Sequence, residues 1–211
     1  MNNTNPETKA WITYLYKLAE GAPTLDRHIA CEKGIGYLED NCPEFFSHPA
    51  SGQSFQHHHS IGGLVQHTAE VIQIGLQTRA VLNLSNIVPY DQFFLAALYH
   101  DVGKVKAYEQ VDGKWVKTRD SRLFHHIHLG VKIFEEMLAK EQLNYPVADA
   151  GGIVHAIMAH HGCREWGSPV APATPVAQLL HQSDMTSARM NDSVRGVDPL
   201  DYKHYKAGEK S

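Results

Sequence analysis

Cysteine is scarce in this 211-residue sequence, and long apolar runs are missing. Cys31, Cys42 and Cys163 are odd in number and form no CxxC pair, which argues against a disulfide framework, a disulfide-linked partner and a thiolate zinc site. No stretch approaches the roughly 18 apolar residues of a membrane span, and the first residues lack a signal-peptide pattern. We therefore expect a soluble protein of a reducing cytoplasm, without a membrane partner.

Positive charge is also in short supply. The 19 Lys and Arg residues are outnumbered by 23 Asp and Glu residues, so the formal net charge is −4. Sequence-independent binding of nucleic acid relies on clustered cations, and this composition argues against it. The sequence has no GxxxxGK[ST] or GxGxxG loop for nucleotides and no GxSxG turn for a serine nucleophile. A phosphate substrate would therefore have to be held by something more local than surface charge.

Histidine, in contrast, is abundant. The chain has 15 histidines, and 12 of them lie between His57 and His181. They recur at long intervals instead of forming one tract, so only folding would gather them. Because imidazole is the commonest protein ligand for borderline divalent metals, this pattern favours a metal site.

Apolar residues recur at helical spacing through most of the chain, which predicts an all-α fold in one compact domain. Thr24 and Asp91 are expected to be helix N-caps. Gly103 is expected to permit the turn that ends the helix begun at Asp91. The Asp112-Gly113 turn signal makes residues 108–120 the only stretch where a short hairpin is expected. The expected helices cover residues 7–20, 25–39, 63–82, 91–102, 123–140, 147–161 and 175–190.

The segment from Phe93 to Lys104, FFLAALYHDVGK, is the centre of the functional hypothesis. Its apolar run leads directly into His100 and Asp101, which a buried helix would carry into the core. Burying an imidazole and a carboxylate without partners costs several kcal/mol, so the pair needs a compensating charge, most economically a metal ion.

Further candidate ligands occur on the inward faces of other expected helices. Helical spacing places His67 on one face with Leu64 and Val71, and an aspartate on the apolar face of the last helix needs a partner. Spacing does not decide between His160 and His161. Six ligands fit two divalent ions better than one tetrahedral zinc, with Asp101 as the bridging carboxylate and a hydroxide as nucleophile. The proposed ligands are His67, His100, Asp101, His126, His160 and Asp184.

Other side chains are candidates for contact with the substrate. Lys104, three residues after Asp101, is placed to reach a phosphate oxygen and is assigned a catalytic role with it. Arg189 is expected either to pair with Asp184 or to contact the substrate, and His181 to orient the carboxylate of Asp184. The remaining candidate substrate contacts are His57, His58 and His161.

The order His, His-Asp, His, His, Asp resembles that of the HD-domain phosphohydrolases. Four segments are similar to the HD portion of the YhaM-type 3′-5′ exoribonucleases: HHHSIGGLVQHTAEV, ALYHDVGK, HHIHLGVKIFEEM and IMAHHGCREWGSPVAPATPVAQLLHQSDMTSARM. The resemblance covers roughly residues 55–190 and implies an HD domain, which we expect to span residues 55–195. From the residue pattern we expect N-terminal helices (residues 1–54) packed on it and a charged tail (residues 196–211). It also implies the ligand set above, with Lys104 and the His57-His58 segment near the scissile phosphate.

The YhaM-type enzymes also have an N-terminal OB-type nucleic-acid-binding domain, whereas the first 55 residues here are expected to be helical. Short oligonucleotides or nucleotides are therefore the expected substrates of a metal-dependent phosphohydrolase. Two alternatives stay open: an HD-fold di-iron oxygenase, and a non-catalytic nucleotide- or nucleic-acid-binding module, including one like the HD region of MobH-type conjugative relaxases. Mn, Fe, Co, Ni, Zn and Mg are all candidate metals, and the sequence does not choose between them or give the oligomeric state.

Overall fold

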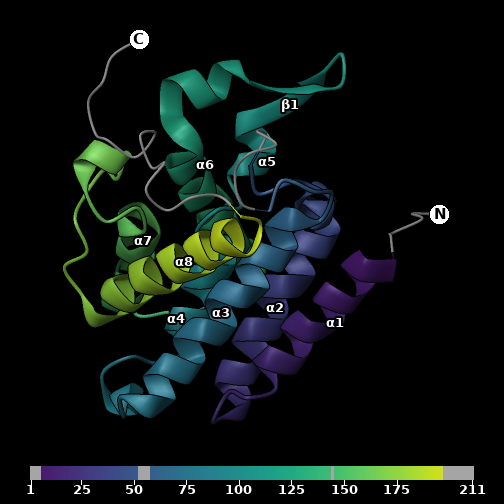
Figure 1. Ribbon diagram of the computed structural model, residues 1–211. Helices are drawn as coiled ribbons and strands as arrows, with labels where there is room; N and C mark the ends of the chain where they lie inside the picture. Colours follow the sequence, from purple (N-terminus) through teal and green to yellow (C-terminus); the bar gives the residue numbers. More distant parts are fainter. Residues whose placement is uncertain (1–5, 52–57, 144, 197–211) are drawn as a thin grey trace.

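A computed structural model describes residues 6–51, 58–143 and 145–196 and shows a helical bundle with one small hairpin (Figure 1). The α-helices are α1 (Pro6–Ala19), α2 (Leu25–Asn41), α3 (Gly63–Val81), α4 (Tyr90–Tyr99), α5 (Lys104–Ala107), α6 (Arg119–Lys140), α7 (Val147–Ala159) and α8 (Pro175–Val194). Short 3-10 turns are η1 (Pro43–Phe46), η2 (Leu84–Asn86) and η3 (Arg164–Trp166), and the strands are β1 (Tyr108–Val111) and β2 (Lys114–Lys117). The all-α prediction is confirmed.

Helix α4 forms the centre of the core. Every residue from Phe93 to Tyr99 is buried and apolar, as expected of a helix surrounded by other helices. It packs against α2, α3 and α7, while α8 crosses α3 on the outside of the bundle (Figure 1). Burial of each large side chain, such as Phe93 or Leu98, stabilises the fold by about 1.5–3 kcal/mol. This packing fixes the end of α4, where His100 and Asp101 follow.

The N-terminal helices cover one side of this core. Helix α1 packs against α3, and α2 packs against α4. Helices α2 and α4 approach each other closely because Gly34 of α2 lies directly against the Leu95 side chain of α4. Thr24 is at the N-cap position of α2, although its side chain makes no capping hydrogen bond. The division into segments 1–54, 55–195 and 196–211 stays a prediction.

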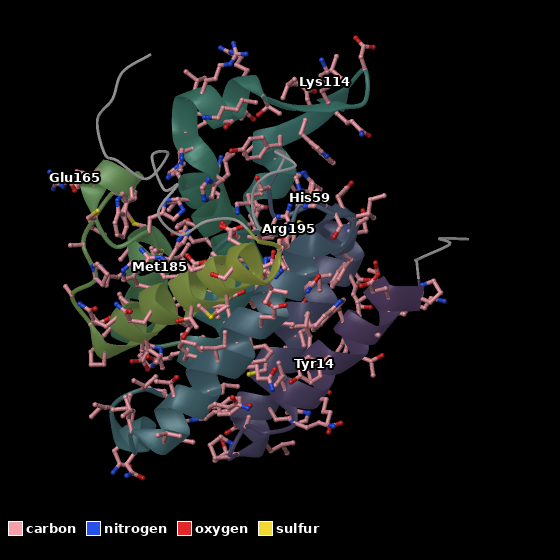
Figure 2. All side chains as sticks on the ribbon, in the orientation of Figure 1. Tyr14, His59, Lys114, Glu165, Met185 and Arg195 are labelled. Carbon is pink, nitrogen blue, oxygen red and sulfur yellow. The ribbon has the colours of Figure 1, made fainter. Side chains whose placement is uncertain are left out.

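The hairpin occurs where it was expected. Strands β1 and β2 pair antiparallel with Tyr108 opposite Lys117, and Asp112 and Gly113 form the turn with φ values of 49° and 75°. Positive φ at both turn residues is the geometry that an Asp-Gly pair favours. Figure 2 shows Lys114 on the hairpin, which projects from the bundle beside α5 and α6.

Two local predictions are wrong. Pro89, not Asp91, is the N-cap residue of α4, and Asp91 instead accepts a 2.6 Å hydrogen bond from the Tyr145 hydroxyl. Helix α6 begins at Arg119, not at 123, because the Thr118 side chain caps it by accepting from the Ser121 amide. The helix is then kinked at His125, where φ is 60° and ψ is 153°.

Gly103 has a different role from the one expected. Its φ of −61° is an ordinary helical value that any residue can adopt, so the backbone conformation does not require glycine here. Instead, α6 passes so close that a Cβ atom on residue 103 would lie 1.9 Å from the His126 carbonyl oxygen and 2.5 Å from the Gly130 amide nitrogen. The absence of a side chain therefore lets the segment after α4 contact α6.

Gly103→Ala is expected to destabilise the protein by about 2–3 kcal/mol, because two main-chain segments must move apart. For a chain of this size, that loss lowers Tm by roughly 5–10 °C. Gly151→Ala is the matched control, since nothing lies within 4 Å of a Cβ at this exposed helical position. Alanine there is expected to raise stability slightly. Equal Tm values for the two variants, measured by circular dichroism, would contradict the close approach.

Across the described ranges, none of the helices combines the length and apolar character needed to cross a membrane. The three cysteines all carry free thiols.

Candidate metal centre

The candidate ligands come from separate helices and meet at one place. His67 lies on α3, His100 and Asp101 follow α4, and Asp184 lies on α8. His126 is contributed by α6, and His160 and His161 follow α7. The six ligands proposed from the sequence are all brought together, and His161 lies with them. Their assignment to a metal stays a proposal.

The first group consists of His67, His100 and Asp184. The Nε2 atom of His67 lies 3.0 Å from Oδ1 of Asp184 and 3.4 Å from Nε2 of His100. The His100 Nε2 atom is 3.9 Å from the same carboxylate oxygen. The donor atoms all lie within 4.8 Å of one another, so they can share one cation.

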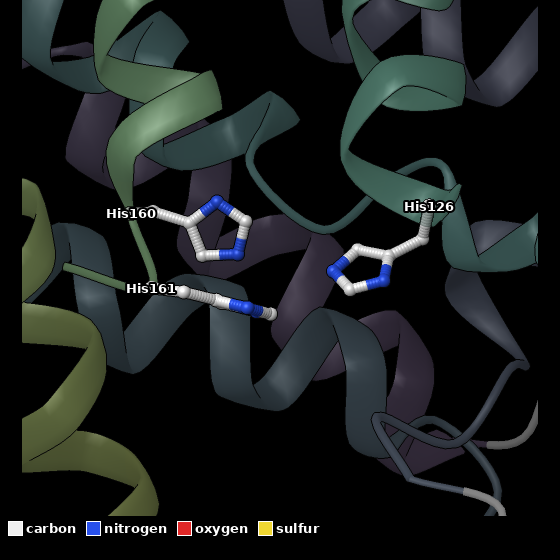
Figure 3. Close-up of side chains that lie close together, drawn as sticks. All are labelled: His126, His160 and His161. Carbon is white, nitrogen blue, oxygen red and sulfur yellow. The ribbon is translucent and has the colours of Figure 1, made fainter. Parts of the chain in front are cut away.

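The second group consists of His126, His160 and His161. Their rings approach one another from α6 and from the end of α7 (Figure 3), with one donor nitrogen from each within 4.8 Å of the others. His126 and His160 are buried, whereas His161 is partly exposed. The sequence left open whether His160 or His161 is the ligand. In the structure both histidines lie in this group.

Asp101 lies between the two groups. Its Oδ2 atom is 3.5 Å from His100 Nε2 and 3.8 Å from His67 Nε2. Its Oδ1 atom is 3.3 Å from His126 Nε2 and 3.7 Å from His160 Nε2. One oxygen thus faces each group, which is the arrangement of a carboxylate that bridges two cations.

Buried polar atoms without partners show that a cation fits this site. Among the described residues, Asp101 Oδ1, His126 Nε2 and His160 Nε2 are buried and form no hydrogen bond. A buried polar atom left in that state costs about 1–3 kcal/mol. All three atoms belong to the ligand set, and a divalent ion would satisfy them together. Imidazole nitrogens with carboxylate oxygens suit Mn, Fe, Co, Ni or Zn.

Hydrogen bonds on the far side of each ring fix the tautomer. The Nδ1 atom of His100 donates to the Ala97 carbonyl, and that of His160 donates to the Ile157 carbonyl, both at 2.7 Å. His161 Nδ1 donates to the Trp166 carbonyl at 2.8 Å. Because a carbonyl only accepts, the proton lies on Nδ1 and the lone pair on Nε2, which points into the site.

His67 is held by a network that sequence reasoning missed. Its Nδ1 atom lies 3.0 Å from the Ser187 hydroxyl, which donates to Glu70 Oε2 at 2.8 Å. The same Glu70 oxygen is 2.9 Å from His58 Nε2. Helical spacing could have revealed both partners, since Glu70 is three residues after His67 and Ser187 is three residues after Asp184.

Charge in this network is fixed by its hydrogen bonds. Burial would raise the pKa of the Glu70 carboxyl, but hydrogen bonds from His58, Ser187 and Gln66 lower it to about 2. His58 is only 3% exposed and contacts Glu70, so the structure places it behind His67, not at the surface facing a substrate. His57, its predicted companion, lies outside the described residues.

His181 and Arg189 are placed differently from the sequence hypothesis. His181 Nδ1 donates to the His160 carbonyl at 2.7 Å, so it supports the turn after α7, not the carboxylate of Asp184. Gly162 in that turn leaves room for the ring, since a Cβ atom there would be 2.3 Å from His181 Cε1. Arg189 is exposed and forms no ion pair with Asp184 in the described structure.

Lys104 lies beside the bridging carboxylate. Its Nζ atom is 2.6 Å from Asp101 Oδ2. It also lines a pocket of about 180 Å³ that opens onto both groups and has an apolar wall. The pocket residues are Asp101, Lys104, His161, Trp166, Asp184, Met185 and Ala188.

Protonation in the site is the one that metal binding requires. Burial alone would raise the pKa of Asp101, but Lys104 and the neighbouring histidines hold it well below its usual value. The pKa of Asp184 is lowered too, by His67 and His100, against the same effect of burial. Burial lowers the pKa of His126 to about 3 and that of His160 well below normal. Near neutral pH, both carboxylates are therefore ionised, and His126 and His160 are neutral.

The metal-free protein is expected to lose stability as the pH falls below 6.5. The pKa of His126 is about 3 in the folded protein and 6.5 as its ordinary value. Between these two pH values the unfolded chain therefore binds more protons than the folded protein does. The free energy of unfolding therefore falls by up to about 1.4 kcal/mol per pH unit for each such histidine. Urea denaturation after chelation, at pH 7.5 and 5.5, measures this, with His126→Gln expected to flatten the slope. Equal stability at both pH values would contradict it.

Comparison with known proteins agrees with this geometry. The family model described as HD domain matches residues 64–189. The 3′-5′ exoribonuclease YhaM of Bacillus subtilis is 30% identical over 157 residues, covering 74% of this chain and 47% of the relative. YhaM of Listeria welshimeri is 30% identical over 171 residues, covering 80% and 50% respectively. This chain thus spans about half the length of the curated relatives, and no solved structure matches it.

The segment matched by the HD-domain model, residues 64–189, contains every residue of the two groups and Asp101 between them. The chain belongs to the HD-domain family.

Proposed function

We propose that this protein is a metal-dependent phosphohydrolase that cleaves phosphoester bonds in nucleotides or short nucleic acids, using two divalent ions. The observation that carries the proposal is the position of Asp101, with Oδ2 toward the first group and Oδ1 toward the second. His67, His100 and Asp184 would hold one ion, and His126, His160 and His161 the other. Two such ions lower the pKa of a bound water and stabilise the charge that develops on phosphate.

The protein side chains supply the remaining parts of this chemistry. The hydrogen bonds to Ala97 and Ile157 hold His100 and His160 in the tautomer that leaves Nε2 free to bind. Lys104 pairs with Asp101, and if cations held that carboxylate, the ammonium group would be free to contact a phosphate oxygen in the pocket. Trp166 and Met185 give this pocket an apolar wall.

Nucleic acid is the favoured class of substrate for two reasons. The relatives at 29–30% identity are named exoribonucleases. Residues 104–122, which lead from the bridge through the hairpin into α6, also contain six Lys and Arg residues and only three acidic ones. This local excess of cations on an otherwise acidic chain suits a short phosphate backbone.

A hydrolysis screen tests the proposal. Chelated protein is reloaded with Mn, Fe, Co, Ni, Zn or Mg and incubated with mononucleotides, cyclic dinucleotides, and short RNA and DNA oligonucleotides. The expected result is metal-dependent release of phosphate or nucleotides from at least one class. Tight ligand binding without turnover in any metal would contradict the proposal and favour a non-catalytic module. A mixed-valence paramagnetic resonance signal of iron-loaded protein without hydrolysis would favour a di-iron oxygenase.

A further inference from the structure

His125 adopts a backbone conformation that glycine adopts far more easily than histidine. Its φ of 60° and ψ of 153° lie outside the left-handed helical region that Asn83 occupies, with φ 55° and ψ 39°. Only glycine enters the region of His125 readily, because a Cβ atom there collides with the backbone. The residue also interrupts α6 from within, where regular helix would otherwise continue.

The chain on both sides of His125 is fixed, which explains how the conformation is maintained. Upstream, the Thr118 amide donates to the Ala107 carbonyl at 3.0 Å, and its hydroxyl donates to the Lys106 carbonyl at 2.8 Å. Downstream, the His126 carbonyl packs against Gly103. Residue 125 has to connect two anchored segments, and this accounts for the kink. It does not account for the histidine, since glycine would make the same kink with less strain.

The imidazole of His125 lies beside the second group. Its ring centroid is 4.3 Å from that of His126 and 6.1 Å from that of His161. A Cβ atom on Gly167 would be 3.9 Å from His125 Cε1, so the ring lies against the turn that follows Trp166 of the pocket wall. The side chain is exposed, and neither ring nitrogen hydrogen-bonds to any other residue that the structure describes.

We propose that His125 is a substrate-binding residue whose imidazole N–H donates a hydrogen bond to a phosphate oxygen of the substrate at the second group. A strained residue that lowers stability and presents a donor beside a metal site is typical of functional positions. The inference rests on the proposed function for its substrate class, since a phosphate must bind at this centre.

His125→Gly is the decisive variant because it preserves the kink and removes only the ring. We expect its Tm to rise by several degrees, its metal content to stay at the wild-type value, and its dissociation constant for inorganic phosphate to increase at least tenfold in Mn²⁺-loaded protein. The kcat/KM for the best substrate of the hydrolysis screen should fall by a similar factor. His128→Gly, an exposed histidine on the same helix with regular geometry, is the control and should lower Tm without weakening phosphate binding.

Side-chain replacement separates a donor role from a structural one. His125→Gln keeps an N–H donor and should recover part of the phosphate affinity, whereas His125→Ala should not. Phosphate affinity within twofold of wild type in His125→Gly would overturn the inference, and so would a Tm that does not rise. If wild-type protein hydrolyses nothing, the proposed function fails, while calorimetric titration of phosphate into the Mn²⁺-loaded variants still decides the role of His125.

Discussion

Asp101→Asn is expected to reduce kcat/KM for phosphoester hydrolysis at least about 1,000-fold, a loss of about 4 kcal/mol of transition-state stabilisation. The reason is that each carboxylate oxygen faces a different group, at 3.3–3.5 Å from its nearest histidine nitrogen. An amide offers one oxygen and one NH₂ group of donors, so it cannot serve both sides. The variant should also retain at least one metal ion fewer per chain, measured by plasma emission spectrometry after dialysis.

The matched control for this variant is Asp112→Asn. Asp112 lies in the exposed hairpin turn with φ 49°, a conformation that asparagine tolerates. Asparagine at position 112 removes the same charge away from the two groups, so the metal content should match that of wild type. Full activity or unchanged metal content in Asp101→Asn would refute the bridging role.

His67→Ala and His126→Ala are expected to separate the two groups. Each variant removes a nitrogen from one group only. His67 Nε2 belongs to the first group and lies 3.0 Å from Asp184 Oδ1, whereas His126 Nε2 belongs to the second group and lies 3.3 Å from Asp101 Oδ1. Each should therefore lose one ion and retain the other, while both lose hydrolysis by at least about 100-fold, since a single remaining ion cannot stabilise attacking and leaving oxygens together.

Metal titration and the double variant provide the check. Equilibrium dialysis with Mn²⁺ should give one ion per chain for each single variant and none for His67→Ala/His126→Ala. His28→Ala, a histidine on α2 paired with Glu32 at 3.1 Å, is the control and should bind as wild type does. Complete loss of both ions in either single variant would show one cooperative cluster instead of two groups.

The sequence predicted which residues would meet because each candidate ligand is on the apolar face of a helix or directly follows a buried helix. His67 falls in register with buried Leu64 and Val71, and His126 with buried Ile133, so burial of the helix face brings the imidazole inward with it. The His100-Asp101 pair could be recognised because an apolar run as long as Phe93–Tyr99 must be central. Periodicity and the cost of burying charge were sufficient for these residues.

Other features depend on contacts between helices that no local pattern encodes. The arrangement of these two groups on either side of Asp101 depends on how α6 and α7 pack against α4. The kink at His125 depends on the approach of Gly103 to α6, which becomes visible only when both helices are placed. Asp91 was assigned to an N-cap from its residue type, but its tertiary hydrogen bond from Tyr145 determined its position.

An anomalous difference map from crystals of this protein soaked in Mn²⁺ tests the two-metal centre most directly. We expect two peaks separated by roughly 3.5–4 Å, one coordinated by His67, His100 and Asp184, the other by His126, His160 and His161, with Asp101 between them. A single peak, or none at these histidines, would contradict the two-metal centre on which the proposed hydrolysis depends.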